Sequence, residues 1–195
     1  ASTFVVKIAT FAKPQNVIRK FMKMHLRTSL LILGLIFLSS FLPIQDSEEK
    51  ELEKSELKAL KQNIIGKRYY HDFAHKKGFD KSEITYLGIA RDNNKKQYKI
   101  LTSYFVYSTS SDMCHGTSCI KIYNLKNEFI GQYYVGAYVS LPDALKDNKL
   151  IYTKNTEQCP IRKNGIIDLS KGLPKEFFIP CTKGGGDIYT FRKGK

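Results

Sequence analysis

Short stretches of alternating hydrophobic and polar residues recur from residue 83 onward, separated by residues that favour turns. The stretches are rich in tyrosine, phenylalanine, isoleucine and valine, a pattern typical of half-buried β-strands. The expected strands are 83–91, 96–108, 119–125, 128–140, 149–153, 165–169, 176–181 and 187–193. So many short strands predict a single mainly β domain, an antiparallel sandwich or a barrel.

Two pairs of neighbouring strands are expected to form hairpins. Strands 83–91 and 96–108 flank a run of Asp and Asn residues, which favour turns. Strands 119–125 and 128–140 flank a Lys-Asn dipeptide. Both alternating sets of side chains in 96–108 are partly apolar, so this strand is predicted to be central in a sheet. The polar segment 142–147 is predicted to be a short helix.

A charged helix is predicted over residues 46–65, which are rich in Glu, Lys and Leu and lack Gly and Pro. Asp46 and Ser47 can cap its N-terminus, and acidic residues in the first turn favour the helix dipole. Its thin apolar stripe consists of Leu52, Leu57, Leu60, Ile64 and Ile65. We interpret it as a charged helical linker or stalk, or as a lid that docks on the β domain through this stripe.

The run from Thr28 to Ile44 contains no charged residue, lies behind a basic flank and precedes an acidic one. This layout favours a secretory signal core, with an uncleaved membrane anchor as the alternative. The basic flank predicts that the rest of the chain lies outside the cytosol, in the periplasm, at the cell surface or secreted. The predicted organisation is a signal peptide or anchor (22–45), the charged helix, and an exported β domain (66–195).

Residues 1–21 are interpreted as a mis-called upstream extension. The chain begins with Ala1, whereas Met22 and Met24 directly precede a segment with the layout of a complete signal peptide. A short presequence is the competing interpretation.

The formal net charge is +14, and lysines outnumber arginines by 26 to 6. Residues 1–45 carry six basic and no acidic side chains, and the lysines of the β region are scattered. Specific nucleic-acid recognition favours arginine and a coherent basic face, so no such recognition is expected. The expected partner is a protein or an anionic envelope component, with membrane contact through 28–44 if this segment is retained.

Four cysteines lie in the predicted exported region, an even number that suggests two disulfides. Sequence spacing favours the local pairs Cys114–Cys119 and Cys159–Cys181, with the two crossed connectivities as alternatives. The alternative role of the first pair is a metal site formed by Cys114, His115 and Cys119, although C-x4-C is at the edge of zinc-site spacing.

Two further motifs are weak candidates. His71 and His75 have the spacing of a helical metal-binding pair, but the surrounding aromatic residues favour an extended segment. A glycine-rich turn could bind an anion through backbone N–H groups, although it lacks the P-loop pattern. Its residues are Lys183, Gly184, Gly185 and Gly186.

The sequence supports two hypotheses for function. The first is an exported or membrane-anchored, non-catalytic β domain that binds a protein or an envelope component. The second is a small exported enzyme or metal-binding protein that uses the Cys114/His115/Cys119 loop or the His71/His75 pair. The sequence contains no G-x-S-x-G motif and no cofactor-binding motif, which favours the first hypothesis.

Processing can be tested by intact-mass analysis of the native protein. We expect translation to begin at Met22 or Met24 and the mature chain to begin between Ser40 and Ser47. A mass that includes the apolar run would show an anchor, and one that includes Ala1 would contradict the predicted start site.

Overall fold

The computed structural model describes three stretches of the chain, which are 45–73, 81–110 and 113–194. Only the backbone is described at 45–48, 108–110 and 113–114. The predicted upstream extension (1–21), and the predicted signal peptide or anchor (22–45) except for Gln45, lie outside the described residues. No helix in the described stretches is long and apolar enough to cross a membrane.

One α-helix, ten strands and two short 3-10 helices make up the described part of the chain. In chain order they are α2 (Gln45–Gln62), β1 (Arg68–Asp72), β2 (Lys81–Arg91), β3 (Gln97–Ser110), β4 (Met113–Tyr123), β5 (Phe129–Tyr134), η1 (Tyr138–Ser140), β6 (Ala144–Lys146), β7 (Lys149–Ile151), η2 (Arg162–Asn164), β8 (Ile166–Asp168), β9 (Glu176–Thr182) and β10 (Gly185–Lys193).

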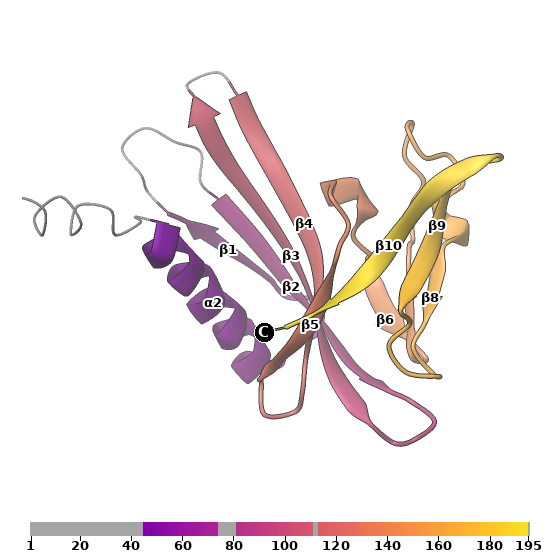
Figure 1. Cartoon of the computed structure of the whole chain (residues 1–195), viewed down its shortest axis with the longest axis horizontal. Coiled ribbons are helices and arrows are strands. Elements are labelled where there is room, and N and C mark those ends of the chain that lie inside the picture. The colour runs from indigo at the N-terminus through magenta and orange to yellow at the C-terminus, as the bar shows by residue number, and fades with distance from the viewer. Residues whose placement is uncertain (1–44, 74–80, 111–112, 195) are drawn as a thin grey trace, which may run out of the picture. The chain divides into compact units, whose positions relative to one another are not determined.

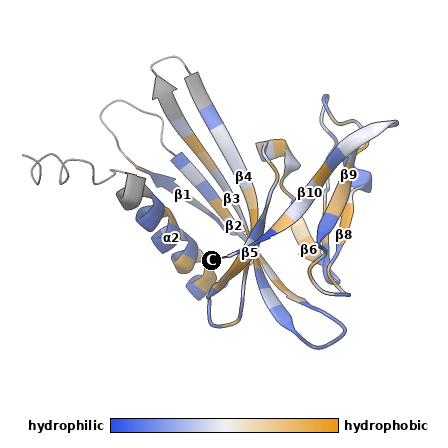
Figure 2. Cartoon of the chain, viewed as in Figure 1, coloured by the Kyte–Doolittle hydropathy of each residue, from blue (hydrophilic) through white to orange (hydrophobic). Residues whose placement is uncertain are grey.

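The strands form two antiparallel sheets (Figure 1). The large sheet has seven strands in the order β1-β2-β3-β4-β5-β10-β9, and the small sheet has three in the order β6-β7-β8. Helix α2 packs on strands β1, β2 and β3 of the large sheet. Figure 2 shows hydrophilic residues along α2 and at the hairpin turns, and hydrophobic residues within the strands.

Each face of the large sheet has its own apolar core. On the helix side, α2 contributes Ala59 and Leu60, both fully buried. The strand residues of this core are Ile84, Tyr86, Leu101 and Tyr123. On the opposite face, large-sheet residues pack with residues from the small-sheet region, and the buried members include Ile100, Ile120, Ile122, Tyr133, Leu150, Tyr152, Ile167 and Leu169. The domain therefore consists of a helix, a large sheet and a small sheet in three layers.

A β-bulge in β2 changes which of its side chains face each core. Tyr86 pairs with Leu101 and Gly88 pairs with Ile100, so Leu87 is an extra residue without a partner in β3. Gly88 has a φ of 125°, which a glycine adopts without strain. Ile84 and Tyr86 face the helix and Leu87 faces the small sheet, as alternation requires. Because the bulge shifts the alternation after Leu87, Ala90 also faces the small sheet.

The mainly β prediction is confirmed, and so is the antiparallel pairing of both predicted hairpins. The central position predicted for 96–108 is also confirmed, because β3 lies between β2 and β4. The predicted strand 128–140 is too long: β5 ends at Tyr134, and Tyr138–Ser140 forms η1. The two sheets differ greatly in size, and a helix covers the second face of the large one, unlike a simple sandwich.

The short helix predicted over 142–147 is wrong. This segment contains strand β6, which pairs with β7 through a turn at Asp147 and Asn148. Both turn residues have positive φ, 50° and 60°, as a tight hairpin turn requires. Asp and Asn tolerate this conformation better than other non-glycine residues, so the polar pair marks a turn rather than a helix.

Helix α2 docks as predicted for a lid, although through more than its apolar stripe. Leu60 is buried and Leu52 and Leu57 pack against the core, whereas Ile64 and Ile65 lie beyond the helix and are exposed. A polar residue also takes part in this docking: Glu56 of α2 is only 2% exposed.

The Glu56 carboxylate is bound by two groups of strand β4. Lys121 Nζ lies 2.6 Å from Oε1, and the Tyr123 hydroxyl donates a hydrogen bond to Oε2 at 2.7 Å. Burial and the neighbouring Glu56 charge raise the pKa of Tyr123, so its hydroxyl remains a donor. A buried carboxylate with these partners fixes the position of α2 along the sheet.

Loss of the Glu56 charge is expected to destabilise the domain by about 3 kcal/mol, because the half-buried charge of Lys121 then loses its partner. Chemical unfolding of Glu56→Gln would measure this loss, with the exposed Glu49→Gln on the same helix as the matched control. The double variant Glu56→Gln/Lys121→Met should recover part of the lost stability. An unchanged unfolding midpoint for Glu56→Gln would show that the ion pair gives no net stabilisation.

Candidate functional site

A cleft of about 440 Å³ opens on the face of the large sheet opposite α2. Strands β2 and β3 form one wall, with Glu83, Thr85, Leu87 and Thr102. The other wall consists of two connecting segments, 138–143 and 153–162, and Gly66 and Arg68 lie at its edge. Apolar side chains in the second wall are Val139, Leu141 and Pro142. The cleft thus combines apolar surface with charged and hydroxyl groups, as small-molecule and peptide sites do.

A hydrogen-bonded group on the sheet side is centred on Glu83. The Tyr138 hydroxyl donates to its two carboxylate oxygens at 3.1 and 3.3 Å, and Arg68 Nε lies 3.4 Å from Oε1. The Tyr138 ring packs against Tyr104 at a centroid distance of 4.8 Å. Burial, together with the Glu83 charge, raises the pKa of Tyr138, which keeps its hydroxyl protonated. This group ties η1 to the large sheet.

Arg162 on the opposite wall is the buried cation of the cleft, with an exposed fraction of 6%. Its Nη2 donates to the backbone carbonyl of Leu141 at 2.6 Å, and its guanidinium carbon lies 4.5 Å from the centre of the Tyr152 ring. Burial lowers the pKa of Arg162, while Tyr152 and Asp143 oppose this shift. An arginine remains protonated under such conditions, so the wall carries a positive charge.

No carboxylate in the described part of the chain forms an ion pair with Arg162. Its Nε is buried and has no hydrogen-bond acceptor among these residues. Asp143 also lines the cleft, but its Oδ2 accepts hydrogen bonds from the Thr153 backbone N–H at 2.7 Å and the Thr153 hydroxyl at 3.0 Å.

The segment that carries Arg162 is held by the disulfide Cys159–Cys181, one of the two predicted pairs, which is confirmed. The Arg162 backbone N–H donates to the Cys159 carbonyl at 3.3 Å, and that of Ile161 donates to the Cys181 carbonyl at 3.4 Å. The bridge therefore links the segment that leads into η2 to strand β9, close in sequence to the buried arginine.

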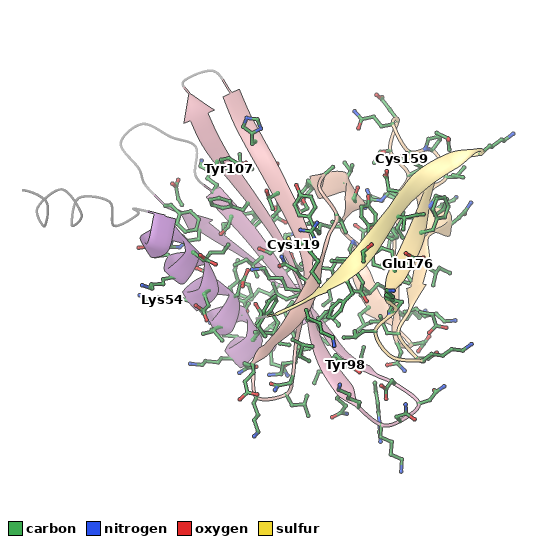
Figure 3. All side chains as sticks on the ribbon, viewed as in Figure 1. Lys54, Tyr98, Tyr107, Cys119, Cys159 and Glu176 are labelled. Carbon is green, nitrogen blue, oxygen red and sulfur yellow. A yellow bond between two sulfur atoms is a disulfide. The ribbon has the colours of Figure 1, made fainter. Side chains whose placement is uncertain are left out.

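The predicted Cys114–Cys119 bridge is wrong, because Cys119 is a free, buried thiol. Both residues belong to strand β4, where five residues span about 17 Å. Burial raises the pKa of the Cys119 thiol, so it stays protonated and unreactive. Figure 3 shows Cys119 within the large sheet, well apart from Cys159. The side chain of Cys114 lies outside the described part.

The alternative metal site at Cys114, His115 and Cys119 also fails on geometry. His115 is exposed and stacks on Tyr107 with ring centroids 5.6 Å apart, about 13 Å along the strand from Cys119. Within the described stretches, no group of three His, Cys, Asp or Glu side chains could hold a metal ion. The tight loop expected between these two cysteines is instead part of strand β4.

The other candidates that the structure describes do not line the cleft. His71 lies on β1 with Nε2 3.4 Å from Glu51 Oε2, and its predicted partner His75 lies outside the described residues. Lys183 and Gly184 form the turn between β9 and β10, while Gly185 and Gly186 begin strand β10. The turn into the last strand is thus as predicted, and its anion binding stays a prediction.

Sequence reasoning missed Glu83, Tyr138 and Arg162. They are far apart in sequence and belong to no motif, and the single signal was an isolated arginine in a lysine-rich chain. Comparison of the chain with protein-family models, with curated proteins and with solved structures gave no match.

The bridge can be tested by unfolding Cys159→Ser/Cys181→Ser. A sequence separation of 22 residues predicts a loss of about 3 kcal/mol, chiefly because the unfolded chain gains freedom. A reducing agent should lower the stability of the wild-type chain to that of the variant and leave the variant unchanged. Equal stability of the oxidised wild type and the variant would contradict a stabilising bridge.

Proposed function

We propose that this chain is a non-catalytic binding module that acts outside the cytosol and holds a polar part of a protein or envelope component in the cleft. The observation that carries the proposal is the cleft itself, with its apolar surface, threonines on its walls and charged groups at fixed positions. A site of this composition favours recognition by hydrogen bonds together with apolar contact.

The arrangement of the lining groups supports binding over catalysis. The two carboxylates of the cleft, Glu83 and Asp143, each accept hydrogen bonds from neighbouring residues of the walls. No cysteine or histidine is among the described residues that line it. Nucleophilic catalysis needs a nucleophile with a base in hydrogen-bond contact. The hydroxyls of Thr153 and Tyr138 do contact carboxylates, but these contacts join segments of the walls, and the described lining has no histidine or cysteine to act with them.

Two features support an extracytoplasmic location. The Cys159–Cys181 disulfide is typical of proteins in oxidising compartments. The uncharged run 28–44 behind a basic flank favours export of the residues on its C-terminal side. Lysine-rich surfaces of exported proteins favour contact with anionic envelope material, which agrees with the proposed class of partner.

Photo-crosslinking from inside the cleft tests the proposal. A benzoylphenylalanine at Val139 in the purified full chain should form a discrete adduct when irradiated with the cell-envelope fraction of the source cells. The same group at Phe178, exposed on strand β9, is the matched control and should not form that adduct.

A second substitution ties the adduct to the cleft. Thr85→Arg places a large side chain on the sheet wall and should abolish the adduct from position 139, while the unfolding midpoint stays close to that of the wild type. Absence of any adduct at position 139, or an identical adduct from both positions, would contradict binding in the cleft.

A further inference from the structure

We infer that Arg162 is the receptor for a free carboxylate, and that the ligand of the cleft is the C-terminal end of a peptide. This inference rests on the proposed function, because it names the ligand of the same cleft. The observation behind it is a buried guanidinium that lines the cleft and forms no ion pair among the described residues. Asp143 is a charged neighbour in the same lining, but its hydrogen bonds go to Thr153.

A buried charge without a partner is costly, and proteins rarely keep one. Arg162 is 6% exposed, and in the described part of the chain it forms no ion pair. The Leu141 carbonyl and the Tyr152 ring stabilise it in part, but neither supplies a full negative charge. One buried donor, Nε, still has no acceptor within these stretches. An anionic ligand at the accessible edge of the guanidinium would supply a negative charge in direct contact with this side chain.

Two other arginines of the described part differ from Arg162. Arg68 pairs with Glu83 and has a side chain that is 57% exposed, and Arg192 is exposed beside the Tyr134 ring. Water hydrates both charges, so neither requires a ligand. Burial without an ion pair is what sets Arg162 apart from them.

The surroundings of Arg162 hold it in one position before any ligand binds. Its Nη2 is fixed by the Leu141 carbonyl, its guanidinium lies over the Tyr152 ring, and its backbone N–H is bonded to the bridged Cys159. A preorganised side chain loses little entropy on binding, which increases affinity. A guanidinium in a fixed orientation matches a carboxylate through two parallel hydrogen bonds.

The rest of the cleft favours a peptide end over an acidic sugar. Apolar contact is available from Leu87, Val139 and Leu141, which suits an aliphatic side chain next to the terminal carboxylate. Glu83 and Asp143 can accept hydrogen bonds from peptide N–H groups. The cleft has one aromatic side chain in its described lining, Tyr138, whose hydroxyl is committed to Glu83. Capture of a C-terminal carboxylate is a recurrent mode of peptide recognition.

The test compares two probes on the unmodified protein. Acetyl-Ala-Ala-Leu with a free carboxylate, and the same peptide as its amide, are titrated into the full chain in detergent and followed by ligand-observed NMR. We expect the acid to bind at least about tenfold more tightly than the amide, because the amide lacks the charge that Arg162 requires.

Variants assign the effect to Arg162. Arg162→Lys keeps the charge but loses the planar fork, and should weaken binding of the acid about tenfold while its affinity for the amide stays unchanged. Arg192→Met, an exposed site on β10, is the control and should bind as the wild type does. Should Arg162→Lys not fold, equal binding of acid and amide by the wild-type protein would still overturn the inference.

The outcomes separate this inference from the proposed function. Equal binding of acid and amide, both abolished by Thr85→Arg, would overturn the carboxylate receptor and leave cleft binding intact. Binding of glucuronate without binding of the peptide acid would overturn the peptide assignment. No binding of either peptide, together with a cleft adduct in the photo-crosslinking experiment, would overturn this inference while supporting the module.

Discussion

Strand β3 has apolar side chains on both faces, and the layers of the domain result from this property. Leu101 faces helix α2 and Ile100 faces the small sheet, and both are fully buried. Each square ångström of apolar surface left in water would cost about 25 cal/mol. A central strand of this kind therefore needs a cover on both sides. Helix α2 covers one face of the strand, and the small sheet covers the other.

The small sheet is much shorter than the large sheet that it covers, and this difference creates the cleft. Strand β3 contains 14 residues, whereas each strand of the small sheet contains three. Such short strands span about 10 Å and cannot cover the full width and length of the large sheet. The segments around η1 and η2 frame the uncovered part, and the disulfide fixes one of them to β9.

The two buried charged residues Glu56 and Arg162 have different roles in this fold. Glu56 is enclosed between layers and is neutralised by Lys121 and Tyr123, so its role is to hold a helix in place. Arg162 has comparable burial, but its contacts are a carbonyl and an aromatic ring, and it lines open space. Buried charges that serve packing are normally paired. The contrast between the two residues is the physical basis for assigning the second to ligand binding.

Local sequence patterns were enough to predict the β-rich class, the two hairpins, the central position of β3, the charged helix and the Cys159–Cys181 pair. These features depend on periods of two or 3.6 residues, or on cysteines close enough to pair across a short loop. The same patterns misjudged 142–147, where two positive φ angles make a hairpin turn from polar residues. They also misjudged Cys119, because an extended strand separates it from Cys114.

The identity of the cleft residues, by contrast, depends on packing. Four separate elements supply Arg68, Glu83, Tyr138 and Arg162. The pairing of β1 with β2, and the packing of η1 and η2 beside the sheet, bring them to the same cleft. The bulge at Leu87 brings Ala90 to the same face of the sheet as Leu87, although the two are three residues apart in sequence. Contacts between residues far apart in the chain depend on how layers pack, and local periodicity holds no information about that packing.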